Sequence, residues 1–471
     1  MREKIGRYFG SKEFYKSVFI LVLPMIIQQG VTSFVNLLDN VMVGALSTEA
    51  ISGVAIVNQL VFVFNLSIFG GFSGAGIFGA QFAGNKDQNG VRSTFRFKLI
   101  LGIAVTVISV VALTAFGDPL INLYLTDTAG DGADLALTFT EAKGYLVYTL
   151  WGLAPFMLSQ AYSSTLRELG QTTMPMVASV ASLLTNLTLN WCLIYGNLGL
   201  PAMGVRGAAL ATVIARFVEA GILLVFCYTH TKEYPFLRKA YRGLFKIPRD
   251  LVGKIIRVGT PLMLNEVLWS LGMAAVNQRY SLRGLSVVAA VNITTTVWHL
   301  FTIIMMAMGT AISIMVGQQL GAGEIERAKD TDRKLIVFSF LAHVAIGALA
   351  FGLAGVIPQI YNVEVEVRAL TTQLLQIAAL SLPLHSITHA CYFTLRTGGR
   401  TVLTFFFDCG FIWIISVPVS TLLCQFTDWS MGAIYFCLQF ADVVKILFAY
   451  PFMKGGSWAR NIISDTKTEE A

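Results

Sequence analysis

Long apolar runs recur along this chain at the length of a membrane-spanning helix. A helix needs ~20 largely apolar residues to cross the hydrocarbon core of a bilayer. Runs of that length predict twelve spans, at roughly 17–38, 51–73, 96–116, 138–160, 174–195, 206–228, 256–278, 287–310, 334–357, 371–393, 402–424 and 431–452. Closed β-barrels, the other spanning structures, are built from short alternating segments of weaker apolarity. The pattern therefore predicts an all-α membrane protein.

The two halves of the chain share local patterns. Residues 165–172 (TLRELGQT) return as 394–401 (TLRTGGRT), which gives T-L-R-x-x-G-x-T once in each half. Other matches follow in the same order: Pro24 with Pro261, 57–58 (VN) with 291–292 (VN), and 79–82 (GAQF) with 317–320 (GQQL). An ordered series of matches indicates an internal duplication, which is common in secondary transporters. We therefore expect two six-helix lobes, 1–229 and 256–471, the second ending in a short basic tail, joined by a cytoplasmic linker at 230–255.

Composition agrees with a bilayer location. Hydrophobic residues make up 55% of the chain and charged residues 13%, and the mean hydropathy is +0.67. These values exclude an ordinary soluble domain. The first apolar run contains Pro24 and Gln28 and has no small-residue cleavage site, so we expect it to be a retained helix and not a signal peptide. The six cysteines lie in or beside predicted spans without a C-x-x-C pair, and predict neither a disulfide nor a metal cluster.

The net charge of +7 is distributed unevenly. Lys and Arg gather before the first span and after each even-numbered span: Lys12, Lys16; Lys86, Arg92, Arg96, Lys98; Arg167; Lys232, Arg242, Lys246; Arg327, Lys329; Arg396, Arg400; Lys454, Arg460. The loop after the third span contains Asp118 and Asp134 instead. By the positive-inside rule, both termini are predicted to be cytoplasmic, in a multi-pass protein of the cell inner membrane. The basic arm indicates topology or lipid headgroup contact, and we expect no nucleic-acid partner.

Polar residues of the first predicted lobe converge near its outer side. A carboxylate inside a span costs about 2.5–3.5 kcal/mol, so it needs a partner or a purpose. Asp39 ends the first span, Asn186 and Asn190 share one face of the fifth, and Thr212 lies at a similar depth in the sixth. One interpretation is a cation-binding or coupling site, for Na⁺ or for a proton on Asp39. The other is that Asp39 ends its helix while the asparagines join neighbouring helices.

The second predicted lobe offers its own candidates for substrate or proton binding. Glu266 lies deep in the seventh span, and Asp408 in the eleventh can face the same cavity; either side chain can instead be structural. His385, in the tenth span, is the third candidate for substrate or proton binding. His385 and His389 are four residues apart, but no third ligand has suitable spacing, so we expect imidazoles bonded to neighbouring helices and no metal site.

Two pairs three residues apart, Arg216 with Glu219 and Asp442 with Lys445, are expected to be local, mostly structural ion pairs.

No enzyme motif occurs in the chain. It contains no H-E-x-x-H, P-loop or nucleophile elbow, and we expect no catalytic residues and no organic cofactor. Without a P-loop, transport by this chain would use an ion gradient. One charge that crosses 100 mV gains about 2.3 kcal/mol, enough for roughly a fiftyfold substrate gradient.

Several motifs together resemble one transporter family. They are Pro24, D-x-x-x-x-G at 39–44, G-x-Q at 79–81, R-x-x-G-x-T at 167–172, N-x-x-x-N at 186–190, G-x-x-G-A-A at 204–209 and Trp458 in the tail. In this order they closely resemble the multidrug and toxic compound extrusion (MATE) family, bacterial NorM- and DinF-like members included. The resemblance covers essentially the whole chain.

The resemblance implies two six-helix lobes and a function. Family members export cationic or amphipathic drugs and xenobiotics by alternating access, in exchange for inward H⁺ or Na⁺. Carried over by position, the family's cation site falls on Asp39, Asn186, Asn190 and Thr212, and the NorM-type glutamate of the seventh helix falls on Glu266. The implied partners are small-molecule substrates and the lipid bilayer, with a monomer as the expected state.

The chain departs from the family pattern at two places. DinF-like members often have Asp at the position of Asn190, and sodium-coupled NorM-type members have Asp at the position of His385. The coupling ion, H⁺ or Na⁺, therefore stays open. An alternative function is flipping of lipid-linked oligosaccharides on a related fold, which predicts an arginine-lined cleft and often extra helices.

Overall fold

The computed structural model describes residues 8–125, 134–237, 240–361 and 363–464. The ends of the two predicted lobes, 1–7 and 465–471, lie outside the described residues. Within the described part the regular structure is helical, without strands, which confirms the all-α prediction. In chain order the helices of the first half are α2 (Lys12–Gly44), α3 (Thr48–Gly84), α4 (Gln88–Asn122), α5 (Leu135–Glu168), α6 (Thr173–Tyr195), the short η1 (Asn197–Gly199), α7 (Val205–Thr229) and η2 (Pro235–Leu237).

The second half follows the same plan with more interruptions. Its helices are α8 (Arg249–Ser281), α9 (Leu285–Gly321), α10 (Ile325–Leu353), η3 (Ile357–Ile360), α11 (Val365–Thr397), α12 (Thr401–Phe405), the π-helices η4 (Phe406–Gly410) and η5 (Ile412–Ser416), α13 (Val417–Phe426), α14 (Met431–Phe440) and α15 (Asp442–Gly455). Each predicted span falls on one helix or one run of joined helices, except that 334–357 extends past the end of α10 at Leu353.

Ten helical segments of the described chain are long and apolar enough to cross a membrane. The two predicted spans missing from this set lie in α5 and α8. Both helices exceed thirty residues, but their apolar runs are diluted, in α8 by Asn265 and Glu266. On α4, Val107, Ile108 and Val111 are more than half exposed, while Gly102 and Thr106 on another face are buried. An exposed apolar stripe beside a buried one is typical of a helix that faces lipid.

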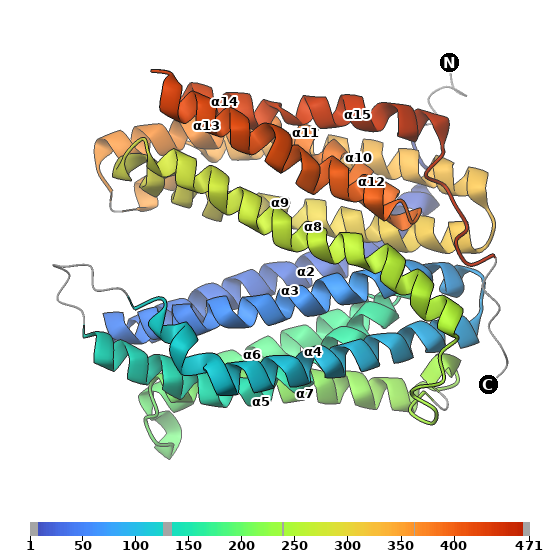
Figure 1. Ribbon diagram of the computed structural model, residues 1–471, viewed down its shortest axis with the longest axis horizontal. Coiled ribbons are helices and arrows are strands. Elements are labelled where there is room, and N and C mark those ends of the chain that lie inside the picture. Colours follow the sequence, from blue (N-terminus) through green and yellow to red (C-terminus); the bar gives the residue numbers. More distant parts are fainter. Residues whose placement is uncertain (1–7, 126–133, 238–239, 362, 465–471) are drawn as a thin grey trace. The chain divides into compact units, whose positions relative to one another are not determined.

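The described chain forms two compact units. One comprises residues 23–79 and 88–252. In it, α7 packs against both α5 and α6, and α5 also packs against α4, as Figure 1 shows. The other comprises residues 8–22, 80–87 and 253–464. Its central helix is α11, which contacts α9, α10, α14 and α15 (Figure 1). The long helices α2 and α3 therefore contribute to both units.

The basic residues predicted in the second loop are mostly helical. Helix α4 begins at Gln88, so Arg92, Arg96 and Lys98 lie on it, and the last two are buried. Arg96 donates hydrogen bonds to the carbonyls of Ala240, Arg242 and Lys246 at 2.9–3.0 Å. The sequence prediction was wrong here because polar and charged residues in the first turns of α4 masked a helix start. The segment after α7 is thus bound to α4 by arginine–carbonyl hydrogen bonds.

Two glycines allow α3 and α9 to cross closely. A Cβ on Gly84 would lie 1.8 Å from the carbonyl oxygen of Gln318, and a Cβ on Gly321 would lie 1.9 Å from that of Gln81. The two contacts are reciprocal, since each glycine faces a backbone carbonyl of the other helix. The contacts thus join Gly84 to Gln318 and Gly321 to Gln81, at and just beyond the segments 79–82 and 317–320 that match in sequence.

The eleventh and twelfth predicted spans are not continuous α-helices. Asp408 lies in the π-helix η4, and Asp442 begins α15 directly after α14 ends. Near η4 a side chain enters the backbone hydrogen bonding, because the Cys409 N–H donates to Asn265 Oδ1 at 3.2 Å. Side-chain insertion and π-turns often accompany functional sites.

Candidate functional site

The four residues of the predicted cation site lie together within one unit. They come from α2 (Asp39), α6 (Asn186 and Asn190) and α7 (Thr212). Asn190 Nδ2 donates to Asp39 Oδ1 at 2.6 Å. Asn190 Nδ2 is also 3.3 Å from Asn186 Oδ1, and Asn186 Nδ2 is 3.1 Å from Thr212 Oγ1. The geometry of these residues therefore agrees with a shared site.

The Asn186 amide is compatible with two orientations. When it is turned over, its nitrogen lies 3.0 and 3.1 Å from the two Asp39 oxygens, and its oxygen accepts from the Thr212 hydroxyl at 3.1 Å. In the first orientation Thr212 Oγ1 donates to the Ala208 carbonyl at 3.0 Å. Both orientations keep the four side chains in one hydrogen-bonded cluster.

One acceptor of this cluster has no hydrogen-bond partner. Asn190 Oδ1 is buried and unpaired, although its own amide nitrogen holds Asp39. A buried carbonyl oxygen without a donor is costly. Together with the carboxylate of Asp39 and the hydroxyl of Thr212, it provides the oxygen atoms that hard cations prefer. The carboxylate of Asp39 can also bind a single proton.

A charged side chain, Arg216, lies near the cluster. Arg216 lies within electrostatic range of Asp39 and pairs with the buried Glu219 at 3.3 Å. Its guanidinium also lies 4.8 Å from the centre of the Phe156 ring. The expected local pair is therefore present, and its arginine reaches further than predicted, toward the predicted cation site.

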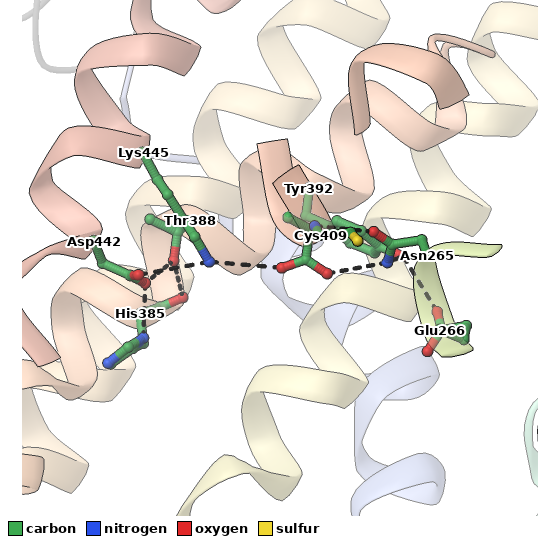
Figure 2. Close-up of polar contacts among 9 residues, drawn as sticks. Asn265, Glu266, His385, Thr388, Tyr392, Cys409, Asp442 and Lys445 are labelled. Carbon is green, nitrogen blue, oxygen red and sulfur yellow. Dashed lines mark hydrogen bonds and ion pairs between the residues drawn. The ribbon is translucent and has the colours of Figure 1, made fainter. Parts of the chain in front are cut away.

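The candidates of the second half lie in one polar network, shown in Figure 2. Asn265 Nδ2 donates to Asp408 Oδ2 at 3.0 Å and lies 3.4 Å from the Tyr392 hydroxyl. Tyr392 donates to Glu266 Oε1 at 3.3 Å. Glu266 and Asp408 thus belong to one cluster, joined by two residues that the sequence did not single out. Asn265 directly precedes Glu266, and this position is the sequence signal that could have identified Asn265.

The same network extends to His385. Its Nδ1 lies 2.8 Å from Asp442 Oδ2, and its Nε2 lies 2.7 Å from Gln439 Oε1. Lys445 Nζ lies 3.6 Å from an oxygen of Asp442 and 3.6 Å from an oxygen of Asp408. Figure 2 shows the end of the Lys445 side chain between Asp442 on one side and Asn265, Tyr392 and Glu266 on the other. The predicted local Asp442–Lys445 pair is therefore one contact in a larger polar network.

The two histidines of α11 have separate neighbours. His385 is bonded to α14 and α15, whereas His389 Nε2 contacts the Met306 sulfur at 3.0 Å. Among the residues that the structure describes, no group of three or more His, Cys, Asp or Glu side chains is arranged to hold a metal ion.

Proteins of known family resemble this chain over most of its length. A probable multidrug resistance protein NorM from Thermotoga maritima is 26% identical over 455 residues, covering 96% of this chain and 94% of that protein. A probable multidrug resistance protein YoeA from Bacillus subtilis is 24% identical, covering 93% of each. A solved structure of the Vibrio cholerae MATE transporter VcmN in the bent form covers 94% of this chain and 97% of its own, with a TM-score of 0.82 at 18% identity.

One protein-family model matches both halves of the chain. The MatE model matches residues 24–192 and 261–422, one segment in each half and well over half of the chain. The matched segments contain Asp39, Asn186 and Asn190 in the first half and Glu266, His385 and Asp408 in the second. The chain therefore belongs to the MatE family, the MATE transporters, and is a multi-pass membrane protein.

Proposed function

We propose that this protein exports cationic or amphipathic compounds in exchange for inward H⁺ or Na⁺ bound at Asp39. The observation that carries the proposal is the cluster of Asp39 with Asn186, Asn190 and Thr212, which includes one buried, unpaired carbonyl oxygen. Relatives named as multidrug resistance proteins support drug-like substrates.

The coupling step follows from the chemistry of the cluster. A cation or proton at Asp39 removes the negative charge that now holds the Asn190 amide and faces Arg216. The hydrogen bonds of α2 to α6 then weaken. Helix α2 contains Pro24, which breaks the regular helical hydrogen bonding and lets the helix bend there. Occupancy of the site by the ion thus favours one conformation of α2, and an alternating-access cycle needs such a difference between states.

Glu266 is the proposed substrate contact in the second half. Its carboxylate accepts a hydrogen bond from Tyr392 and lies within electrostatic range of Arg396. A carboxylate inside a membrane protein attracts protons or cationic ligands. Trp269 and Met273, further along α8, are partly exposed.

The test is export of ethidium or a fluoroquinolone by the purified protein in liposomes, with a pH gradient and a Na⁺ gradient imposed separately. We expect one gradient to drive export and Asp39→Asn to abolish it while insertion and thermal stability persist. Wild-type export by Asp39→Asn would refute the role of Asp39. No export under either gradient would refute drug antiport and direct attention to lipid-linked substrates.

A further inference from the structure

The side chain of Lys445 lies between two carboxylates from different helical segments. Its ammonium is 3.6 Å from Asp408 Oδ1, in η4, and 3.6 Å from Asp442 Oδ1, in α15. All three side chains are largely withdrawn from solvent, with exposed fractions of 12%, 20% and 8%. We propose that Asp408 and Asp442 form a site for a monovalent cation, and that Lys445 occupies it as a cation attached to the protein itself.

The second oxygen of each carboxylate is held by other donors. Asp408 Oδ2 accepts from Asn265 at 3.0 Å. Asp442 Oδ2 accepts from Thr388 at 2.9 Å and contacts His385 Nδ1 at 2.8 Å. These contacts fix Oδ2 of both carboxylates, so that Oδ1 of each faces the Lys445 ammonium. Two oriented carboxylate oxygens beside one positive charge provide the kind of oxygen ligand that hard cations prefer.

Nearby groups favour a positive charge at the same point. The Lys445 ammonium lies 4.8 Å from the centre of the Phe411 ring, and the faces of aromatic rings attract cations. Both carboxylates lie where the backbone departs from a continuous α-helix, Asp408 in a π-helix and Asp442 at the start of α15. Without Lys445, two negative charges would face each other in a poorly solvated place, which is strongly unfavourable.

Under the proposed function, in which the coupling ion binds at Asp39, Lys445 limits ion coupling to that residue. A lysine at the site withdraws Asp408 and Asp442 from exchange with the medium, so ion coupling is left to Asp39. Replacement of the lysine by a small neutral residue is then expected to create a second ion-binding site in this half of the protein.

Thermal unfolding of purified protein in detergent tests the inference without any transport assay. Asp39→Asn serves as the background, so that the first cluster does not contribute. We expect added Lys445→Ala to lower the melting temperature, and Na⁺ or ethylammonium to restore it saturably. The parent Asp39→Asn should show no such response. Adding Asp408→Asn to the lysine variant should abolish the response. A response equal in all three proteins, or absent from a folded Lys445→Ala variant, would overturn the inference.

If Lys445→Ala does not fold, a second pair of variants tests the same inference. Lys445→Met combined with Asp408→Asn removes one charge of each sign and leaves the packing volume nearly unchanged. We expect this double variant to fold and to be more stable than Lys445→Met alone. If Lys445 contributes only packing, the double variant will be no more stable than the single one, which would also overturn the inference. Transport failure in wild-type liposomes would refute the proposed function and leave these thermal results intact.

Discussion

At the scale of single residues, a variant in the cluster around Asp39 can distinguish the two possible coupling ions. A proton needs one titrating carboxylate, whereas Na⁺ gains from each additional oxygen ligand. The unpaired Oδ1 of Asn190 is such a ligand, and the amide nitrogen of the same residue orients Asp39. Asn190 is therefore the residue whose replacement separates the two mechanisms.

For Asn190→Ala, Na⁺ coupling predicts a loss of Na⁺ affinity of about 10 to 100-fold, since hydrogen bonds and contacts to a charged group contribute about 1.5–3 kcal/mol. The measurement is export rate against Na⁺ concentration in liposomes. Under proton coupling the carboxylate alone carries the ion, and export driven by a pH gradient should persist. Asn197→Ala, outside the cluster in the turn after α6, is the matched control.

A second residue-scale feature is the buried ion pair of Lys98 and Glu168. Lys98 Nζ lies 2.6 Å from Glu168 Oε1 and donates to Ser164 and Thr165 at 3.1 Å. The lysine side chain is fully buried and the glutamate nearly so. Removal of one partner leaves an uncompensated buried charge, which costs about 3–5 kcal/mol.

We therefore expect Lys98→Met to destabilise the protein by about 3–5 kcal/mol, and Lys98→Met with Glu168→Gln to regain most of that loss. Chemical denaturation of the purified variants provides the comparison. Equal stability of the single and double variants would mean that the pair contributes only packing.

At the scale of secondary structure elements, the crossing of α3 and α9 depends on the absence of two side chains. Gly84 and Gly321 each face a backbone carbonyl of the other helix, so an added Cβ at either position would force the two helices apart. Backbone atoms of a helix cannot move aside to relieve a close contact, whereas a flexible side chain can. Close helix crossings in membrane proteins commonly use small residues for this reason.

We expect Gly84→Ala and Gly321→Ala each to destabilise the protein by about 1–3 kcal/mol through overpacking. Gly221→Ala in α7 is the control, because no atom lies within 4 Å of a Cβ placed there. That change should be neutral or stabilise by up to ~1 kcal/mol, through the higher helix propensity of alanine. Melting temperatures of the three variants measure the difference, and equal effects would argue against a tight crossing.

At the scale of the whole molecule, charge distribution predicts orientation in the membrane. Basic residues gather on the side of the termini and of the segment after α7, so that side should be cytoplasmic. The turn after α6 should then be outside. Two exposed apolar residues report these sides: Leu198 is 80% exposed and Phe245 is 83% exposed.

In intact cells, a membrane-impermeant thiol reagent should label Leu198→Cys and should label Phe245→Cys only after permeabilisation. The unmodified protein provides the background, because five of its six cysteines are buried. The reverse labelling pattern would contradict the positive-inside assignment and place the termini outside.

The sequence alone determined the fold class and predicted the twelve spans and the members of the first cluster. Apolar runs of spanning length have few structural solutions, and helical periodicity places Asn186 and Asn190 on one face. The cost of a carboxylate inside a span singled out Asp39, Glu266 and Asp408 without any coordinates, and the family resemblance supported the first two.

Only the tertiary structure decided which polar groups meet. Lys445 and Asp442 suggest a local pair when read along one helix, yet the lysine also binds Asp408, which is distant in sequence. Arg96 and Lys98 suggest loop charges, yet packing buries both, one against backbone carbonyls and one against Glu168. The physical reason is that periodicity fixes the faces of a single helix, whereas partners across helices depend on the rotation and depth at which the helices pack.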